Sequence, residues 1–258
     1  MSRFLSKASE SLLPYTPGEQ PQGRKFIKLN TNECPYPPSP KVAEAILAGY
    51  EEIAAGCGTA GAAGRAEKAD CGCDAGATEA GKMAEKAAQI MPPELANLRL
   101  YSDPEERVLV EAIAAHYGVG TNQVIAGNGS DEILGFAFRA FCDSEAPMQF
   151  ADLTYGFYPA LCGLYGIPFR VVPLEEDFTL NIEPYKNCGN NVIIANPNAP
   201  TGMNLPLSAI EEVAASNPDR VVMVDEAYVD FGGESCVSLL PKYENLVIIQ
   251  TFSKSRSL

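Results

Sequence analysis

Residues 221–254 read VVMVDEAYVDFGGESCVSLLPKYENLVIIQTFSK, and this stretch contains two short apolar runs rich in β-branched residues. The runs are VVMVD at 221–225 and LVIIQ at 246–250. Apolar runs of this length, bounded by turn residues, are typical of buried strands. Each run brings polar chemistry to its carboxyl end, an acidic pair after the first and a lysine after the second.

Runs of the same kind recur upstream, and helical patterns separate them. The additional predicted strands are QVIA at 123–126, QFAD at 149–152, FRVV at 169–172 and NVIIA at 191–195. Apolar residues recur at three and four positions in 131–141 and 207–215, which predicts helices there. This alternation predicts an α/β fold with a mostly parallel, buried sheet, whose functional loops gather at the carboxyl ends of the strands.

Composition narrows the class of protein. The chain has 258 residues, 46% of them hydrophobic, so it is long enough to bury a sizeable core. A net charge of −14 without a Lys/Arg cluster argues against a nucleic-acid partner. No signal peptide and no long apolar run is visible, so we expect a cytoplasmic protein without a membrane segment. The eight cysteines are irregularly spaced, and we expect reduced thiols.

The N-terminal third differs in character from the rest. Residues 1–52 are interpreted as an extended arm, rich in Pro and Tyr between Leu13 and Ser39, followed by a first helix. Residues 53–93 consist mainly of Ala, Gly, Glu and Lys, which predicts a low-complexity insertion with little core. Its Cys57, Cys71 and Cys73 raise the question of zinc, but without a CxxC pair or a nearby histidine we expect no metal.

Three strand ends carry candidate chemistry. The first is AGNGSDE at 126–132, where two glycines and a helix N-terminus can present backbone amides to a phosphate. The alternative is that Ser130 or Asp131 only caps the helix. The second is Asp225, which needs a cation or a strong hydrogen-bond donor if it is buried, and a protonated heterocyclic nitrogen would supply that. The alternatives for Asp225 are solvent exposure or a metal-ligand role.

The third strand end is TFSKS at 251–255, which carries Lys254. A lysine becomes a nucleophile only when it is desolvated or when its pKa is lowered, and most loop lysines are solvated charges. The conjunction of a phosphate cradle, a carboxylate and a lysine favours a functional interpretation. Pyridoxal phosphate requires these three groups.

The order of motifs resembles a known family. GNGSDE at 127–132, TYGFY at 154–158, NPNAPTG at 196–202, DEAY at 225–228 and TFSKS at 251–255 resemble histidinol-phosphate aminotransferases of the fold-type I pyridoxal-phosphate superfamily. LLPYTPGEQPQG, IKLNTNECPYPPSP and LRLYSDPE are similar to the arm and first segments of the same family. The resemblance implies a seven-stranded-type, mostly parallel sheet in an incomplete large domain at 94–258, with the C-terminal small domain absent.

The resemblance also implies roles for individual residues. Lys254 would carry pyridoxal 5'-phosphate and move the proton, and Asp225 would hold the pyridine nitrogen protonated. Tyr228 would donate to the phenolic oxygen, and Tyr155 would stack on the ring, whereas Tyr158 is interpreted as a core aromatic. The resemblance places the phosphate of the cofactor at Gly129, Ser130, Asp131 and Ser253. Tyr101 would reach the phosphate bound in the other subunit of a homodimer. Tyr15 and Asn32 would contact the substrate.

One position departs from the family pattern. In NPNAPTG the residue expected to bond the phenolic oxygen is Ala199, which leaves Asn198 as the candidate. The implied function is transamination between histidinol phosphate and 2-oxoglutarate in histidine biosynthesis. The alternatives are a threonine-phosphate decarboxylase or aromatic aminotransferase of the same superfamily, and an inactive α/β module.

Overall fold

The structure is a computed structural model that describes residues 3–10, 12, 38–56, 95, 98 and 100–256. The chain divides into two units, one formed by Met1–Tyr15 with Arg107–Leu258 and the other by Thr16–Glu106. In the second unit the long helix is α2, Pro40–Gly56. The predicted insertion lies outside the described residues, apart from the last turn of α2.

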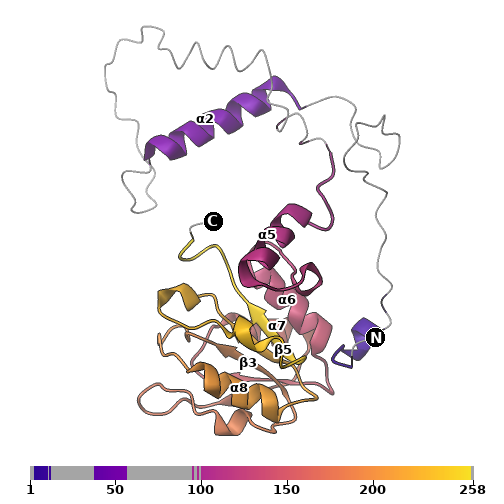
Figure 1. Ribbon diagram of the computed structural model, residues 1–258, viewed down its shortest axis with the longest axis vertical. Coiled ribbons are helices and arrows are strands. Elements are labelled where there is room, and N and C mark those ends of the chain that lie inside the picture. Colours follow the sequence, from indigo (N-terminus) through magenta and orange to yellow (C-terminus); the bar gives the residue numbers. More distant parts are fainter. Residues whose placement is uncertain are drawn as a thin grey trace. The chain divides into compact units, whose positions relative to one another are not determined.

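The first unit contains a five-stranded sheet in which all neighbouring strands are parallel (Figure 1). The order across the sheet is β2-β1-β3-β4-β5. The predicted α/β class with a parallel sheet is therefore confirmed, and five of the predicted runs are strands to within one residue. The strands are β1 Met148–Ala151, β2 Phe169–Val172, β3 Asn191–Ala195, β4 Val222–Asp225 and β5 Leu246–Ile249.

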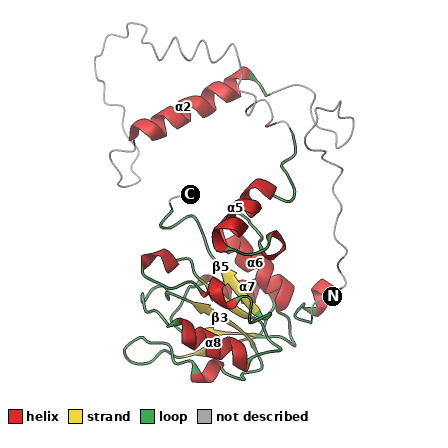
Figure 2. Ribbon diagram, viewed as in Figure 1, coloured by secondary structure: helices red, strands yellow, loops and turns green. Residues whose placement is uncertain are grey.

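Helices alternate with the strands along the chain (Figure 2). The two predicted helices are confirmed as α6, Gly129–Phe141, and α8, Leu207–Ser216. The other helices of this unit are α1 Lys7–Glu10, α5 Arg107–Tyr117 and α7 Phe157–Tyr165, with short 3-10 turns η2 Thr121–Gln123, η3 Glu183–Tyr185, η4 Val229–Phe231 and η5 Cys236–Leu239. Within the described part of the chain, no helix is both long and apolar enough to cross a membrane.

The sheet has a core on each face because successive side chains of a strand point in opposite directions. In β3, Val192 and Ile194 pack with α8, whereas Ile193 packs with α6 and α7. β4 alternates in the same way, with Val222 and Val224 on the α8 face. Figure 1 shows α8 on one side of the sheet and α6 and α7 on the other. The result is a three-layer arrangement in which the central strands β3 and β4 are covered on both faces, whereas the edge strand β2 is mostly exposed.

One predicted strand was wrong. Residues 123–126 are not a strand, although the backbone of Val124 is extended, with φ −120° and ψ 134°. The side chain of Ile125 is 68% exposed. A strand exists only when a neighbour completes its hydrogen bonds, and no strand of the described residues pairs with this segment. The described sheet accordingly has five strands rather than the seven that the resemblance implied.

Candidate functional site

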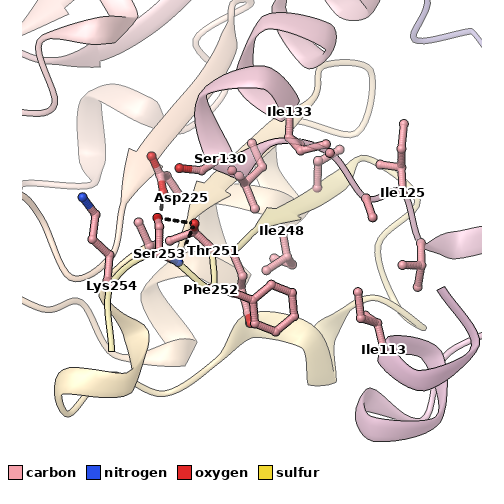
Figure 3. Close-up of a pocket in the computed structure, with 18 of the residues that line it drawn as sticks. Ile113, Ile125, Ser130, Ile133, Asp225, Ile248, Thr251, Phe252, Ser253 and Lys254 are labelled. Carbon is pink, nitrogen blue, oxygen red and sulfur yellow. Dashed lines mark hydrogen bonds between the residues drawn. The ribbon is translucent and has the colours of Figure 1, made fainter. Parts of the chain in front are cut away.

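A cavity of about 850 Å³ lies at the carboxyl ends of β4 and β5, beside the N-terminus of α6. All its lining residues belong to the first unit. Figure 3 shows Ser130, Asp225, Ser253 and Lys254 toward one end of the pocket and the isoleucines Ile113 and Ile125 toward the other. The pocket is therefore polar where the three predicted strand ends meet and apolar elsewhere.

The N-terminus of α6 presents backbone amides to this pocket. Gly129 begins the helix with φ +75°, a left-handed conformation that glycine adopts without strain. Asn128 occupies the N-cap position but makes no side-chain cap bond, and its backbone amide donates to Oε2 of Glu132 at 2.7 Å. Ser130 and Asp131 lie inside the helix, so neither occupies the capping position that the sequence left open. The first-turn amides thus remain suited to an anion.

Asp225 ends β4 and is only 4% exposed, which excludes the solvent-exposed alternative. Its Oδ2 accepts a 2.7 Å hydrogen bond from the hydroxyl of Tyr158, and its Oδ1 accepts one of 3.1 Å from the amide of Ala227. Burial raises the pKa of Asp225, and these two hydrogen bonds oppose the rise. Among the more distant charges, Asp131 raises the pKa and Lys254 lowers it. The carboxylate is thus desolvated and suited to a cationic donor from the pocket.

A metal is not indicated as that cation. Among the residues whose positions are described, no group of three His, Cys, Asp or Glu side chains could hold a metal ion. Cys57, Cys71 and Cys73 fall in the part of the chain whose structure is not described. The metal-ligand alternative for Asp225 therefore gains no support from its surroundings.

Lys254 follows β5 and lies on the pocket wall. Its Nζ lies 5.5 Å from the centroid of the Tyr228 ring, within the range of a cation–π contact. Tyr228 also lines the pocket and is 36% exposed. The predicted pair of Lys254 and Tyr228 is thus brought together, with the ammonium facing an aromatic ring.

Ser253 precedes the lysine in a tight turn. The hydroxyls of Ser253 and Thr251 lie 2.7 Å apart, and the Ser253 amide donates to Oγ1 of Thr251 at 3.2 Å. Thr251 is buried, so it anchors the turn, while Ser253 stays exposed on the pocket wall. The predicted phosphate contact from Ser253 therefore has the required access.

Tyr155 connects the TYGFY loop to α6. Its hydroxyl donates to Oδ1 of Asp131 at 3.0 Å, and its ring lines the pocket. Partial burial and then the bond to Asp131 raise the pKa of Tyr155 to about 12, so the phenol stays protonated and remains a donor near neutral pH. The ring is thus fixed at the pocket edge, where the sequence predicts stacking.

Asn198 is hydrogen-bonded to its own chain. It is 6% exposed, and its amide is committed to protein partners: Nδ2 donates to the Leu153 carbonyl and to the Thr201 hydroxyl, each at 3.0 Å. Its Oδ1 accepts from the Thr154 hydroxyl at 2.8 Å. Ala199, not Asn198, lines the pocket. Asn198 therefore holds the 196–202 turn against the 153–154 loop, and its contact with the cofactor stays a prediction.

Three predicted residues are not placed relative to this pocket. Tyr101 is 64% exposed and belongs to the second unit. Tyr15 and Asn32 lie outside the described residues. Their roles therefore remain predictions.

The sequence motifs did not reveal a series of hydrogen-bonded polar side chains that begins at Arg256, two residues after Lys254. Arg256 donates through Nη2 to the Tyr117 hydroxyl at 3.2 Å, and that hydroxyl donates to Oε1 of Gln250. Nε2 of Gln250 then donates to Oε2 of Glu226 at 2.8 Å, and Glu226 is 1% exposed. Arg256 also pairs with Asp230 at 2.9 Å. Only the acidic pair in DEAY hinted at this arrangement, because the other members are far apart in sequence.

The donor set of the pocket fits one kind of guest. Helix amides and the Ser253 hydroxyl suit a phosphate, the buried carboxylate suits a protonated ring nitrogen, and the lysine suits a carbonyl carbon. Residues 77–258, well over half of the chain, match the family described as aminotransferase class I and II. The chain belongs to this aminotransferase family.

The aminotransferase chain also has curated relatives. A histidinol-phosphate aminotransferase of Pseudomonas putida strain W619 is 45% identical over 258 residues, which cover 100% of this chain and 62% of the relative. Histidinol-phosphate aminotransferase 2 of Dechloromonas aromatica strain RCB is also 45% identical, with coverages of 100% and 61%. This chain thus spans about three fifths of the length of these relatives.

The fold of the aminotransferase chain is similar to solved structures as well. The histidinol-phosphate aminotransferase of Sinorhizobium meliloti, solved in complex with pyridoxal-5'-phosphate, matches with a TM-score of 0.56 and 24% identity, covering 62% of this chain and 46% of that one. The enzyme of the same name from Clostridium acetobutylicum matches with a TM-score of 0.54, 24% identity and coverages of 61% and 48%. At this level of identity the likeness concerns the fold.

Proposed function

We propose that this chain holds pyridoxal 5'-phosphate in the pocket and takes part in transamination between histidinol phosphate and 2-oxoglutarate, which gives imidazole-acetol phosphate and glutamate in L-histidine biosynthesis. The observation that carries the proposal is the convergence of the α6 N-terminus, Asp225 and Lys254 on one cavity. The names of the relatives that are 45% identical support the choice of substrate.

The residues of the pocket divide the work of binding. The amides of Ser130 and Asp131, with the Ser253 hydroxyl, bind the phosphate. Asp225 pairs with the protonated pyridine nitrogen, and Tyr155 covers one face of the ring. Arg256 is not assigned to the phosphate, and Nε and Nη2 of its guanidinium bind Asp230 and Tyr117.

The chemical step rests on Lys254. When bound, the cofactor supplies an electron-withdrawing ring that makes the substrate Cα–H bond acidic. Lys254 would hold the cofactor through its side-chain amine, and that amine would then take up and return the proton of the substrate Cα. Tyr228, against whose ring the ammonium lies, donates to the phenolic oxygen.

The remaining contacts of the proposal involve Tyr101, Tyr15 and Asn32. Tyr101 reaches the phosphate bound in the partner of a homodimer, so a complete site needs two chains. Tyr15 and Asn32 contact the substrate. The reaction takes place in the cytoplasm.

Covalent trapping tests the cofactor assignment. The full chain is incubated with pyridoxal 5'-phosphate, reduced with borohydride and digested, and the peptides are analysed by mass spectrometry. We expect a pyridoxyl group on Lys254, its loss in Lys254→Ala, and its retention in Lys242→Ala, which removes a surface lysine paired with Glu211. A folded chain that carries no adduct, or carries it on another lysine, contradicts the proposal and favours the inactive-module alternative.

An activity assay tests the substrate assignment. Histidinol phosphate with 2-oxoglutarate should yield glutamate in the wild type and none in Lys254→Ala. Threonine phosphate and aromatic amino acids are tested in parallel. Turnover of one of these without glutamate formation from histidinol phosphate overturns the substrate assignment while leaving the cofactor site intact.

A further inference from the structure

The carboxylate of Asp225 lies among groups from four elements. Tyr158 approaches from α7, Asp131 from α6, Lys254 from the turn after β5, and the Ala227 amide from the turn after β4. The phenols of Tyr155 and Tyr228 also line this pocket. Tyr158 and the Ala227 amide are the two that donate hydrogen bonds to the carboxylate.

Packing alone explains the ring of Tyr158 but not its hydroxyl. The side chain is fully buried, and its ring centroid lies 5.9 Å from that of Phe150 and 6.3 Å from that of Phe138. A phenylalanine would fill the same space. The hydroxyl instead donates a 2.7 Å hydrogen bond to Oδ2 of Asp225. This bond is short and charge-assisted, and both of its groups are buried.

Tyr185 shows what a purely structural tyrosine looks like in the same domain. It is also fully buried, and its hydroxyl has no hydrogen-bond partner within the part of the chain that the structure describes. The two tyrosines therefore differ in one respect that matters here: only the hydroxyl of Tyr158 is bonded to a pocket carboxylate. Tyr185 is a matched control for the loss of a buried hydroxyl.

We propose that Tyr158 is a positioning residue for Asp225, whose hydroxyl fixes one carboxylate oxygen, keeps the carboxylate ionised in its desolvated site, and so leaves the shared proton on the pyridine nitrogen. The part of this inference that concerns the nitrogen rests on the proposed function. The part that concerns Asp225 applies to the chain without cofactor.

The reasoning follows from competition for one proton. An ionised carboxylate has about four acceptor sites, of which Tyr158 and Ala227 use two, so capacity remains for a donor from the pocket. Burial favours the protonated form of Asp225, and each donated hydrogen bond favours the ionised form. Without the Tyr158 hydroxyl the carboxylate of Asp225 binds a proton more strongly. It then takes the shared proton from the pyridine nitrogen.

The first experiment uses the full chain without cofactor. The carboxyl carbons of aspartate are labelled with ¹³C, the Asp225 signal is assigned with Asp225→Asn, and its titration midpoint is measured by NMR. Loss of one hydrogen bond to a charged group should raise the midpoint by about 1–2 pH units in Tyr158→Phe. Tyr185→Phe should leave it unchanged. Equal midpoints in the wild type and in Tyr158→Phe overturn the proposal.

If Tyr158→Phe does not fold, a second variant tests the proposal, and for this variant we expect the Asp225 midpoint to shift in the opposite direction. 3,5-Difluorotyrosine at position 158 keeps the shape of the ring but is a stronger donor. Burial and the neighbouring Asp225 raise the pKa of Tyr158 well above its ordinary value. We expect the Asp225 midpoint to fall. A midpoint that stays or rises contradicts the proposal.

A third measurement adds the cofactor. With pyridoxal phosphate labelled with ¹⁵N in the ring, the nitrogen shift should report a less protonated ring in Tyr158→Phe than in the wild type or in Tyr185→Phe. An unchanged nitrogen shift in a loaded Tyr158→Phe chain overturns the part that concerns the nitrogen. Failure of the wild-type chain to bind the cofactor contradicts the proposed function instead, while the titration of Asp225 still tests Tyr158.

Discussion

Arg256 donates two hydrogen bonds to the carboxylate of Asp230, from Nε to Oδ2 at 2.9 Å and from Nη2 to Oδ1 at 3.1 Å. Asp230 lies in η4, which follows β4, and Arg256 lies two residues beyond Lys254. The pair therefore ties together the segments that follow two neighbouring strands. It also fixes the backbone on which the candidate lysine is placed.

The strength of this tie can be measured with a double-mutant cycle. Arg256→Gln and Asp230→Asn should each destabilise the chain, with a coupling of about 0.5–1 kcal/mol, as is usual for a partly exposed ion pair. Arg256→Lys should recover only part of it, because an ammonium cannot bind both oxygens in this planar way. Urea unfolding provides the energies, and additive single effects would show that the pair contributes nothing.

The same pair predicts a response to acid. The guanidinium of Arg256 and the Ser255 hydroxyl hold the pKa of Asp230 below its usual value of 3.8. The stability that Asp230 contributes is therefore present above that value and is lost as the pH falls through its lowered pKa. We expect the difference between the wild type and Asp230→Asn to be constant near neutral pH and to shrink in strong acid. A difference that grows in acid contradicts this assignment.

Asp225→Asn should stabilise the chain in the absence of cofactor. Burial raises the pKa of Asp225, so the stability associated with its neutral form is present below the usual aspartate pKa and is lost as the pH rises through the raised one. An amide avoids that loss, and we expect a gain of about 0.5–2 kcal/mol near neutral pH, the usual size of a stabilising substitution. The gain should disappear in acid, and retention of the cofactor should fall. A pH-independent gain would show that the charge is not its cause.

Gly129→Ala should weaken α6 through the backbone alone. A Cβ at this position meets no atom within 4 Å, but φ is +75°, where a side chain costs about 1–2 kcal/mol. Gly163, inside α7, has equally free space without a positive φ, so Gly163→Ala should stabilise by about 0.5–1 kcal/mol. Thermal unfolding compares them. Equal effects of the two substitutions would remove the conformational argument for the α6 start.

Two buried thiols should be inert in the folded chain. Burial raises the pKa of Cys142 to about 12 and that of Cys162 to about 11, from an ordinary 9.0. Iodoacetamide at pH 8 should therefore label both only after unfolding in urea, as peptide mapping can show. The raised pKa values also predict how the free energy of unfolding depends on pH. The contribution of the two neutral thiols is present below their ordinary pKa and is lost as the pH rises through the raised values. Rapid labelling of folded Cys142 contradicts its burial.

Local patterns predicted the elements that depend on local chemistry. NVIIA became a strand at the predicted residues, because an apolar β-branched run is buried on both faces of a parallel sheet. FRVV also became a strand at the predicted residues, but as the edge strand beside β1, where three of its four residues are exposed. QVIA has the same pattern, but a strand also needs a neighbour, and a pattern cannot supply one. The sequence therefore predicts which segments can form strands better than which ones do.

The sequence predicted which residues come together at the site, but not the direction in which each side chain points. The strand ends carrying Asp225 and Lys254 meet because parallel strands share one carboxyl edge. The motif did not reveal which way the Asn198 amide points, and the amide donates to Leu153 and Thr201. Tyr158 was interpreted as core alone, since its bond to Asp225 spans 67 residues.

The all-parallel sheet also has a consequence for how the chain folds. No neighbouring strands are joined by a tight turn: β1 pairs with β3, although α7 and all of β2 lie between them in the chain. Every pairing must close a long loop before any contact stabilises it, so folding should be slow for the size of the domain. During that interval the apolar strands are exposed to other chains. Refolding yield should therefore fall steeply as protein concentration rises, even under conditions where the native state is stable.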